Sequence, residues 1–137
     1  MGESMFEGGC LCGALRFRVE TRPIGTGYCH CTLCQRSTGA PVLAWASFPV
    51  EKFSYTKGHA TLYDSSTWGH REFCNQCGTQ IGFRETDAAT TIDLNVGCMD
   101  DPSAFPPACH IHEEDRISWF DTSDELPRHP GAEPSAG

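Results

Sequence analysis

The sequence predicts a mainly β protein, with a sandwich-like or barrel-like arrangement of strands and one short helix. Short apolar runs recur about every 8–12 residues, which is the strand spacing of such folds. Glycine and proline, 14 and 9 residues in a chain of 137, suit the many turns that short strands require. Seven of the nine cysteines lie in three groups, with one or two residues between neighbouring sulfurs.

The expected strands follow one another along most of the chain. The first is expected at residues 15–19, where Leu15, Phe17 and Val19 alternate with charged residues. Residues 42–48 predict a more buried strand centred on Trp45, because a proline stands at each end. Apolar residues predict further strands at 53–55, 62–63, 92–96, 111 and 117–119.

One helix, one domain and a tail complete the predicted organisation. The helix is expected around residues 33–37 and is ended by Gly39 and Pro41. The chain has the length of a single domain, which we place at residues 1–127. The segment PRHPGAEPSAG has no large apolar side chain, so residues 128–137 are expected to form a flexible C-terminal tail.

The charge of the chain excludes some classes of partner. The formal net charge is −8, which repels phosphate backbones and anionic membrane surfaces, so we expect no nucleic acid and no membrane partner. No run of about 20 apolar residues is present, and residues 1–9 lack the pattern of a signal peptide. We therefore expect a cytoplasmic protein with reduced thiols. The sequence does not indicate an oligomeric state.

The first and third cysteine groups predict a closed metal site. Cys10, Cys12, Cys74 and Cys77 supply four sulfurs, the number that completes a tetrahedral structural zinc site. A glycine follows each pair, which predicts two hairpins that present sulfurs at their tips, with positive φ at the glycines. A redox C-x-x-C motif is the alternative, but it belongs at a helix N-terminus, whereas the flanking sequences here are strand-like.

The middle group predicts an open metal site. Cys29, Cys31 and Cys34 supply three sulfurs, so zinc here would keep one exchangeable position, where it could hold an incoming thiol as thiolate. Three thiolates make zinc a weaker Lewis acid, so thiol exchange suits this site better than water activation. The candidates for the fourth ligand are water and Cys98, Cys109, His30, His110 and His112.

The middle group also has alternative interpretations. If a cysteine is the fourth ligand, the site is a second structural zinc site. Disulfide bonds are disfavoured, because the number of cysteines is odd. His30 stands between two ligands and is expected to point away from them, near the site or at the surface. The arginines closest in sequence to the cysteine groups could bind carboxylates of a substrate; these are Arg36, Arg71 and Arg84.

Together, the cysteine segments resemble a known family. GGCLCGALRF, CHCTLCQRSTGAP and REFCNQCGTQI are similar to segments of the glutathione-dependent formaldehyde-activating enzyme family, whose domain is shared with a centromere-associated protein family. The resemblance spans residues 6–127 and implies a single zinc-binding domain with an Mss4-like β fold. It implies two zinc ions per chain, one held by Cys10, Cys12, Cys74 and Cys77 and the other by Cys29, Cys31 and Cys34.

Three functions follow as hypotheses. The resemblance implies a carbon–sulfur lyase that joins or splits formaldehyde and a small-molecule thiol, possibly glutathione, as S-hydroxymethylglutathione. The open three-sulfur site agrees with this chemistry. The alternative is a non-catalytic, zinc-stabilised binding module for a protein partner, and a third possibility is zinc or redox buffering by the middle cysteines. A response of the metal sites to added thiol distinguishes the enzyme from the module.

Overall fold

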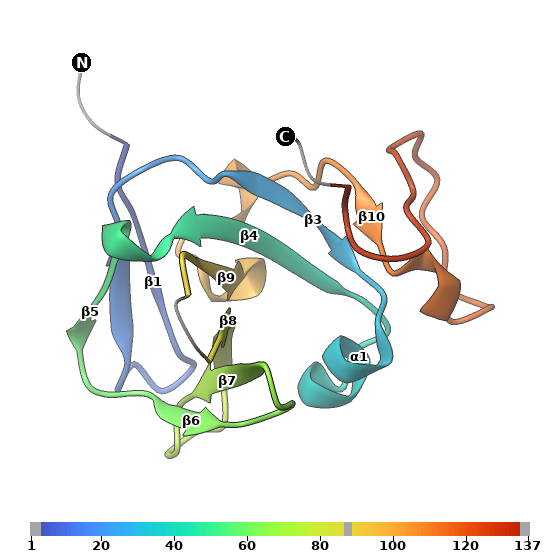
Figure 1. Ribbon diagram of the computed structural model, residues 1–137. Helices are drawn as coiled ribbons and strands as arrows, with labels where there is room; N and C mark the ends of the chain where they lie inside the picture. Colours follow the sequence, from blue (N-terminus) through green and yellow to red (C-terminus); the bar gives the residue numbers. More distant parts are fainter. Residues whose placement is uncertain (1–3, 87–88, 135–137) are drawn as a thin grey trace.

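The computed structural model describes residues 4–86 and 89–134 and is mainly β with one short α-helix, as predicted (Figure 1). In chain order the elements are β1 (Phe6–Gly9), β2 (Arg16–Val19), β3 (Gly25–Cys29), α1 (Thr32–Thr38), β4 (Leu43–Pro49), η1 (Val50–Lys52), β5 (Phe53–Lys57), β6 (Thr61–Tyr63), β7 (Gly69–Phe73), β8 (Gln80–Glu85), β9 (Thr91–Asn95), η2 (Val96–Cys98), η3 (Pro102–Ala104), β10 (His110–Ile111) and η4 (Glu113–Asp115). No helix in these two described ranges has the length and apolar character needed to span a bilayer.

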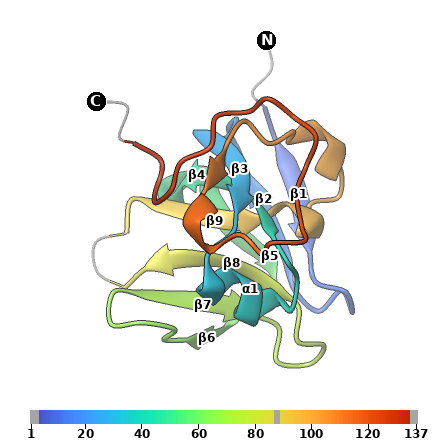
Figure 2. The same ribbon diagram turned by 90° about the vertical axis from the view of Figure 1, so that its right-hand side faces the viewer.

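The strands form two sheets that are not closed into a barrel over the described residues. The larger sheet has the order β10-β3-β4-β9-β8-β7-β6, and the smaller has the order β1-β2-β5. β10 runs parallel to β3, whereas the neighbouring strand pairs are antiparallel. Figure 2 turns the side that carries α1 toward the viewer, with the C-terminal segment crossing in front of the sheet. The sandwich-like alternative therefore describes the fold, and the barrel does not.

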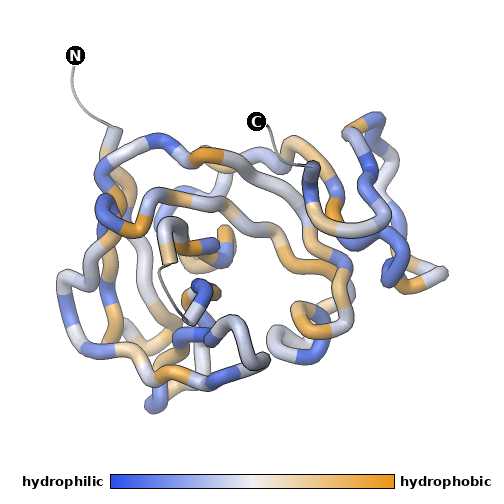
Figure 3. Tube along the Cα trace, viewed as in Figure 1, coloured by the Kyte–Doolittle hydropathy of each residue, from blue (hydrophilic) through white to orange (hydrophobic). Residues whose placement is uncertain are grey.

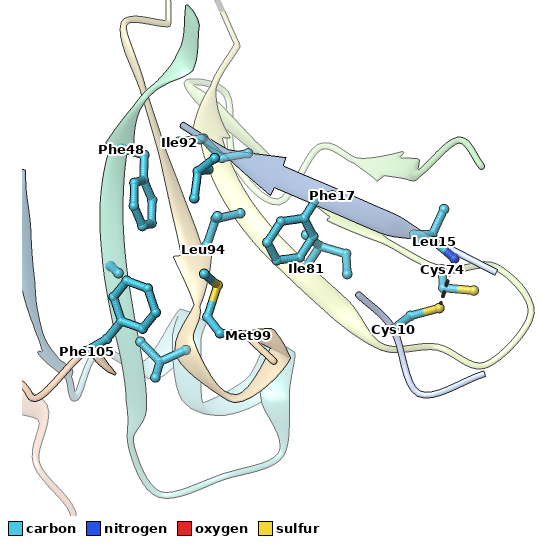
Figure 4. Close-up of a cluster of buried hydrophobic side chains, with 13 residues drawn as sticks. Cys10, Leu15, Phe17, Phe48, Cys74, Ile81, Ile92, Leu94, Met99 and Phe105 are labelled. Carbon is cyan, nitrogen blue, oxygen red and sulfur yellow. Dashed lines mark hydrogen bonds between the residues drawn. The ribbon is translucent and has the colours of Figure 1, made fainter. Parts of the chain in front are cut away.

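The hydrophobic core fills the space between the two sheets. Phe17 of β2 faces Ile81, Leu94 and Phe48 of the larger sheet, and all four side chains are fully buried (Figure 4). Burial of each such side chain contributes about 1.5–3 kcal/mol, so these contacts hold the sheets together. Hydrophobic and hydrophilic residues alternate along the chain in Figure 3, and the C-terminal segment is largely hydrophilic.

β3 was not predicted, and β1 was implied only by the hairpin around Cys10 and Cys12, because both strands are glycine-rich and carry little apolar alternation. Their glycines allow close packing. A Cβ at Gly8 would lie 2.3 Å from the carbonyl oxygen of Cys98, and one at Gly27 would lie 2.8 Å from the indole ring of Trp45. Tertiary contacts therefore leave no room for a side chain at these positions, and the local sequence pattern does not reveal such contacts.

The predicted strand at residues 117–119 is wrong. The chain turns there, Trp119 is 76% exposed, and residues 117–119 belong to none of the strands found in the described ranges. The helix prediction is confirmed: α1 ends at Thr38 and is capped by Gly39, which has a φ of 69° in the left-handed region. The predicted strands at 15–19, 42–48, 53–55, 62–63, 92–96 and 111 correspond to β2, β4, β5, β6, β9 and β10.

The described part of the expected tail is in contact with the domain. The backbones of Arg128 and His110 form an isolated parallel β-bridge, and the amide of His112 donates to the carbonyl of Gly131 at 2.8 Å. Arg128 also binds Glu113 and Asp121. These contacts argue against a domain boundary at residue 127. The domain bounds of 1–127 stay a prediction.

Candidate functional site

The first candidate metal site joins the tips of two hairpins. Cys10 and Cys12 lie in the turn between β1 and β2, and Cys74 and Cys77 lie in the turn between β7 and β8. The four sulfurs lie within 4.8 Å of one another, which is a donor set of the number and type that zinc requires. Figure 4 shows Cys10 and Cys74 together at one end of the core. The two hairpins predicted from the sequence are therefore present.

Backbone groups fix the orientation of these sulfurs. Gly13 and Gly78 have φ of 81° and 82°, as predicted, and their amides close the two turns onto backbone carbonyls. The sulfur of Cys10 accepts from the amide of Leu15 at 3.2 Å. Such N–H···S bonds stabilise charge on sulfur, so the arrangement fits thiolates that hold a metal.

The second candidate site lies between the end of β3 and the start of α1. The sulfurs of Cys29, Cys31 and Cys34 lie within 4.8 Å of one another, and the sulfurs of Cys29 and Cys31 are 3.3 Å apart. Cys31 caps α1, because its sulfur accepts from the amide of Cys34 at 3.3 Å. The contact with Cys29 lowers the pKa of Cys31 to about 2, since a neighbouring thiol that donates stabilises a thiolate.

These three sulfurs line a cavity of about 430 Å³, a volume typical of small-molecule sites. The strand register explains the opposite wall. Ser47, Asp93, Phe83 and Arg71 are cross-strand partners in turn, so they form one row across β4, β9, β8 and β7. Residues alternate between the faces of a strand, and this row therefore faces the cavity while Phe48, Leu94 and Ile92 face the core.

The remaining walls are aromatic, apolar and charged. Trp45 and Trp68 line the cavity together with Leu33 of α1. Asp115 and Glu133 come from the C-terminal part of the chain. The cavity therefore combines one arginine with several carboxylates, a charge distribution that suits a small molecule bearing both signs of charge.

Arg71 is the cation at this cavity, and it is only 7% exposed. Its guanidinium stacks over Phe83, 5.3 Å from the ring centroid. Within residues 4–86 and 89–134 its Nε has no hydrogen-bond partner, and no carboxylate oxygen lies within 4.0 Å of the side chain. Burial of a cation without a counter-charge is unfavourable, so the site is suited to an incoming anion.

The other two predicted arginines take different places. Arg84 forms an ion pair with Glu72, which also accepts a hydrogen bond from Tyr55 at 2.6 Å. Arg36 lines a neighbouring cavity of about 530 Å³, which shares Leu33 and Arg71 with the first one. Neither Arg36 nor Arg84 contributes to the lining of the three-sulfur cavity.

The two cysteines proposed as the fourth ligand lie in different parts of the structure. Cys98 donates to the carbonyl of Gln80 and packs against the core that holds Cys10 and Cys77, which is the side of the four-sulfur site. Cys109 packs with Cys29 and Cys34 but donates to the carbonyl of Thr26. Burial raises the pKa of the Cys98 thiol, and likewise that of Cys109, to about 11.

The histidines differ from the predictions. His30 is fully buried and contacts His110 at 2.8 Å. Of the two expected positions, near the site or at the surface, the surface position is wrong, and the His30 ring is grouped with His110 and Glu113 instead of with the sulfurs. His70 lies in β7, and its side chain is 12% exposed. Of the three histidines proposed as ligands, His112 lines the three-sulfur cavity.

The comparisons with known proteins identify the family. A family model described as glutathione-dependent formaldehyde-activating enzyme matches residues 5–115, the part that contains both cysteine sites. The chain belongs to the glutathione-dependent formaldehyde-activating enzyme family. The resemblance seen in the cysteine segments is thereby confirmed.

Two similar proteins carry names of the same class. A Schizosaccharomyces pombe protein named as an uncharacterized lyase is 28% identical over 91 residues, which cover 66% of this chain and 66% of the relative. A Halomonas elongata protein named as a putative glutathione-dependent formaldehyde-activating enzyme is 24% identical over 126 residues, 85% of this chain and 80% of the relative. These names support the prediction of an enzyme of the glutathione and formaldehyde type.

A solved structure supports the fold of this family member. The crystal structure of a Rhodobacter sphaeroides protein matches with a TM-score of 0.54 and 22% identity, and the match covers 89% of this chain and 98% of the other. This similarity shows the fold alone.

Sequence reasoning missed the polar row of the cavity. Asp93 stands between Ile92 and Leu94 in the strand predicted at residues 92–96. The alternation was a usable signal, since it marks a face that is not core. The identity of that face as a cavity wall depends on the pairing of β9 with β4 and β8, which the sequence does not show.

Proposed function

We propose that this family member is a zinc-dependent carbon–sulfur lyase that acts on a small thiol–aldehyde adduct such as S-hydroxymethylglutathione. The single observation that carries the proposal is the position of three convergent sulfurs and a buried, unpaired Arg71 on the walls of one cavity. The sulfurs offer a place for a metal and a thiol, and the arginine offers a place for a carboxylate of the same molecule.

The two cysteine groups would have different roles in this proposal. Cys10, Cys12, Cys74 and Cys77 would hold a structural zinc ion, and Cys29, Cys31 and Cys34 would hold a second one with an exchangeable position. When bound there, zinc would supply a site that keeps the substrate thiol as its thiolate. His112 lines the same cavity, but the group of convergent donor atoms consists of the three sulfurs, so the fourth position would be left to the substrate.

The protein residues would orient the substrate around that sulfur. Arg71 would bind a carboxylate through its free guanidinium nitrogens, while Asp115 and Glu133 would face an ammonium group. The indole rings of Trp45 and Trp68 would reduce access of water to the reacting atoms. The neighbouring cavity, which also contacts Arg71, offers room for the rest of a peptide-like thiol.

Asp93 would donate the proton that the aldehyde oxygen gains. In the forward direction the thiol loses its proton to solvent, its sulfur bonds to the carbonyl carbon of formaldehyde, and the carbonyl oxygen takes a proton from the Asp93 carboxyl to become the hydroxyl. The Asp93 carboxylate then regains a proton from solvent. Asp93 lines the cavity, and burial raises its pKa, so its carboxyl can hold a proton at higher pH than an exposed aspartate can. The reverse reaction uses the same steps in the opposite order.

Rapid mixing of the zinc-loaded protein with glutathione and formaldehyde tests the function. We expect the approach to equilibrium to be faster than the spontaneous reaction and to scale with protein concentration. The Cys31→Ser variant is the control, because it is expected to keep the fold and the structural ion. A rate equal to that of the spontaneous reaction, together with metal spectra that do not respond to glutathione, would favour the binding module instead.

Substitution of Arg71 is expected to weaken substrate binding. Arg71→Gln removes charge-assisted hydrogen bonds worth about 1.5–3 kcal/mol, which corresponds to a roughly 10–100-fold increase in KM. The effect on kcat is expected to be smaller. Arg22→Gln is the matched control, because Arg22 is exposed and does not line the cavity. Equal KM values for the two variants would show that Arg71 does not bind substrate.

Substitution of Asp93 is expected to slow the reaction and to change its pH dependence. Asp93→Asn should lower kcat by about 10²–10⁴-fold. The wild-type rate above the spontaneous rate should fall as pH rises through the pKa of Asp93, because the carboxyl loses the proton that it donates, and the Asn variant should lack this decline. Ser47 hydrogen-bonds to Asp93 and thereby lowers its pKa, so Ser47→Ala should move the decline to higher pH. A shift to lower pH would contradict this role.

A further inference from the structure

A third group of metal-ligating side chains lies outside both cysteine sites. His30, His110 and Glu113 present donor atoms that lie within 4.8 Å of one another. Both imidazoles are fully buried, and no step of the proposed reaction uses them. His30 follows β3, His110 lies in β10 and Glu113 begins η4, so the group joins three segments of the chain.

Hydrogen bonds to His110 leave one of its nitrogens free to bind a ligand. Its Nε2 lies 3.2 Å from both carboxylate oxygens of Asp124. Because a carboxylate accepts hydrogen bonds, the proton of a neutral His110 lies on Nε2, and Nδ1 keeps its lone pair. Histidines that bind metals are commonly oriented in this way, with the second nitrogen donating to a carboxylate.

Glu113 is held in a corresponding manner. Its Oε1 accepts hydrogen bonds from Arg116 and Arg128, each at 3.0 Å. Its Oε2 is buried and has no hydrogen-bond partner in the described part of the chain. This oxygen lies 3.4 Å from Nε2 of His30 and 3.9 Å from Nδ1 of His110. The free acceptor of Glu113 is therefore directed at the two imidazoles.

We propose that His30, His110 and Glu113 form a third metal site, which binds zinc or a similar divalent transition-metal ion. Two imidazoles and one carboxylate are an established donor set for zinc, and they suit calcium and magnesium less well. The three donor separations are 2.8, 3.4 and 3.9 Å. A tetrahedral ion with bonds of about 2.0–2.1 Å separates its ligands by about 3.3 Å, so the two imidazoles would move apart by about 0.5 Å.

Binding requires a change in the protonation of one side chain. In the absence of an ion, Nε2 of His30 donates to Nδ1 of His110 at 2.8 Å. With the ion bound, His30 carries its proton on Nδ1, an atom without a hydrogen-bond partner among the residues that the structure describes. The imidazole stays neutral, and no proton is released. The ion would fix β10 and η4 to the segment that carries Cys29 and Cys31.

Cadmium-113 NMR of the full chain at saturating cadmium tests the third site. We expect a resonance in the region of nitrogen and oxygen ligands, separate from the strongly deshielded resonances of the two thiolate sites. Glu113→Gln should remove it, because a neutral amide replaces the carboxylate. Glu114→Gln should retain it, since Glu114 is exposed and carries the same charge. Asp124→Asn should weaken cadmium binding by about 10–100-fold.

The two thiolate resonances report folding in each variant, so loss of the third resonance alone identifies a lost ligand. Thiolate resonances without any nitrogen and oxygen resonance in the wild-type protein would overturn the proposal and assign the group as a hydrogen-bonded histidine pair. Loss of the third resonance in both the Glu113 and the Glu114 variant would overturn it as well. The readout is independent of the lyase reaction.

Discussion

Replacement of Cys77 by serine is expected to unfold the protein or to lower its melting temperature severely. The four sulfurs join the β1–β2 turn to the β7–β8 turn, two hairpins that are 62 residues apart in sequence between Cys12 and Cys74. Structural zinc binding contributes about 10–16 kcal/mol in small modules, which is as large as the whole stability of a typical domain of about 5–15 kcal/mol. Circular dichroism during thermal melting measures the loss.

Cys98→Ser is the matched control for this experiment. Cys98 lies near the four-sulfur site, but it donates to the carbonyl of Gln80, and a serine hydroxyl can make the same hydrogen bond. We expect a change in the free energy of unfolding of about 1 kcal/mol or less. A strong chelator should reproduce the effect of Cys77→Ser in the wild-type protein. Similar melting curves for the Cys77 and Cys98 variants would show that the cluster does not hold a structural ion.

Replacement of Cys31 by serine is expected to abolish the proposed activity and to leave the fold intact. Cys31 caps a helix of 7 residues and joins no distant segments, since Cys29, Cys31 and Cys34 come from one stretch of chain. Loss of a ligand there should remove the thiol-binding metal and lower kcat/KM by about 10³-fold or more, the size seen when a central catalytic group is removed. The rate above the spontaneous reaction measures this loss.

The fold and the metal content of the Cys31 variant need separate measurements. Cobalt-substituted protein should lose the part of the thiolate-to-cobalt absorption that responds to glutathione and keep the part that does not. Cys109→Ser should retain both parts, because Cys109 is a buried thiol beside the same sulfurs that donates to Thr26. Equal thermal collapse of the Cys31 and Cys77 variants would mean that the middle site is structural as well.

The proposed function depends on the contrast between these two sites. The sulfurs of the first site are positioned by turns at one end of the core, whereas those of the second form part of a cavity wall. A structural ion needs a complete set of ligands, and a reactive one needs access for substrate. The different expected outcomes for Cys77 and Cys31 therefore test the assignment directly.

Local sequence patterns were enough to predict the mainly β class, the short helix and the division of seven cysteines into groups of four and three. Alternation, turn residues and cysteines two or three positions apart act within a few residues, so each of these signals is local. Glycines after Cys12 and Cys77 even indicated the positive φ of the two turns.

The surroundings of the sulfurs are set by contacts between distant segments of the folded chain. Arg71 was one of three possible arginines until the pairing of β7 with β8 placed it over Phe83 at the cavity. The register of β9 places Asp93 on the cavity wall, and His30, which was expected near the site or at the surface, is a buried partner of His110, 80 residues away. Contacts between distant segments depend on the packing of the whole sheet, and a local pattern carries no information about that packing.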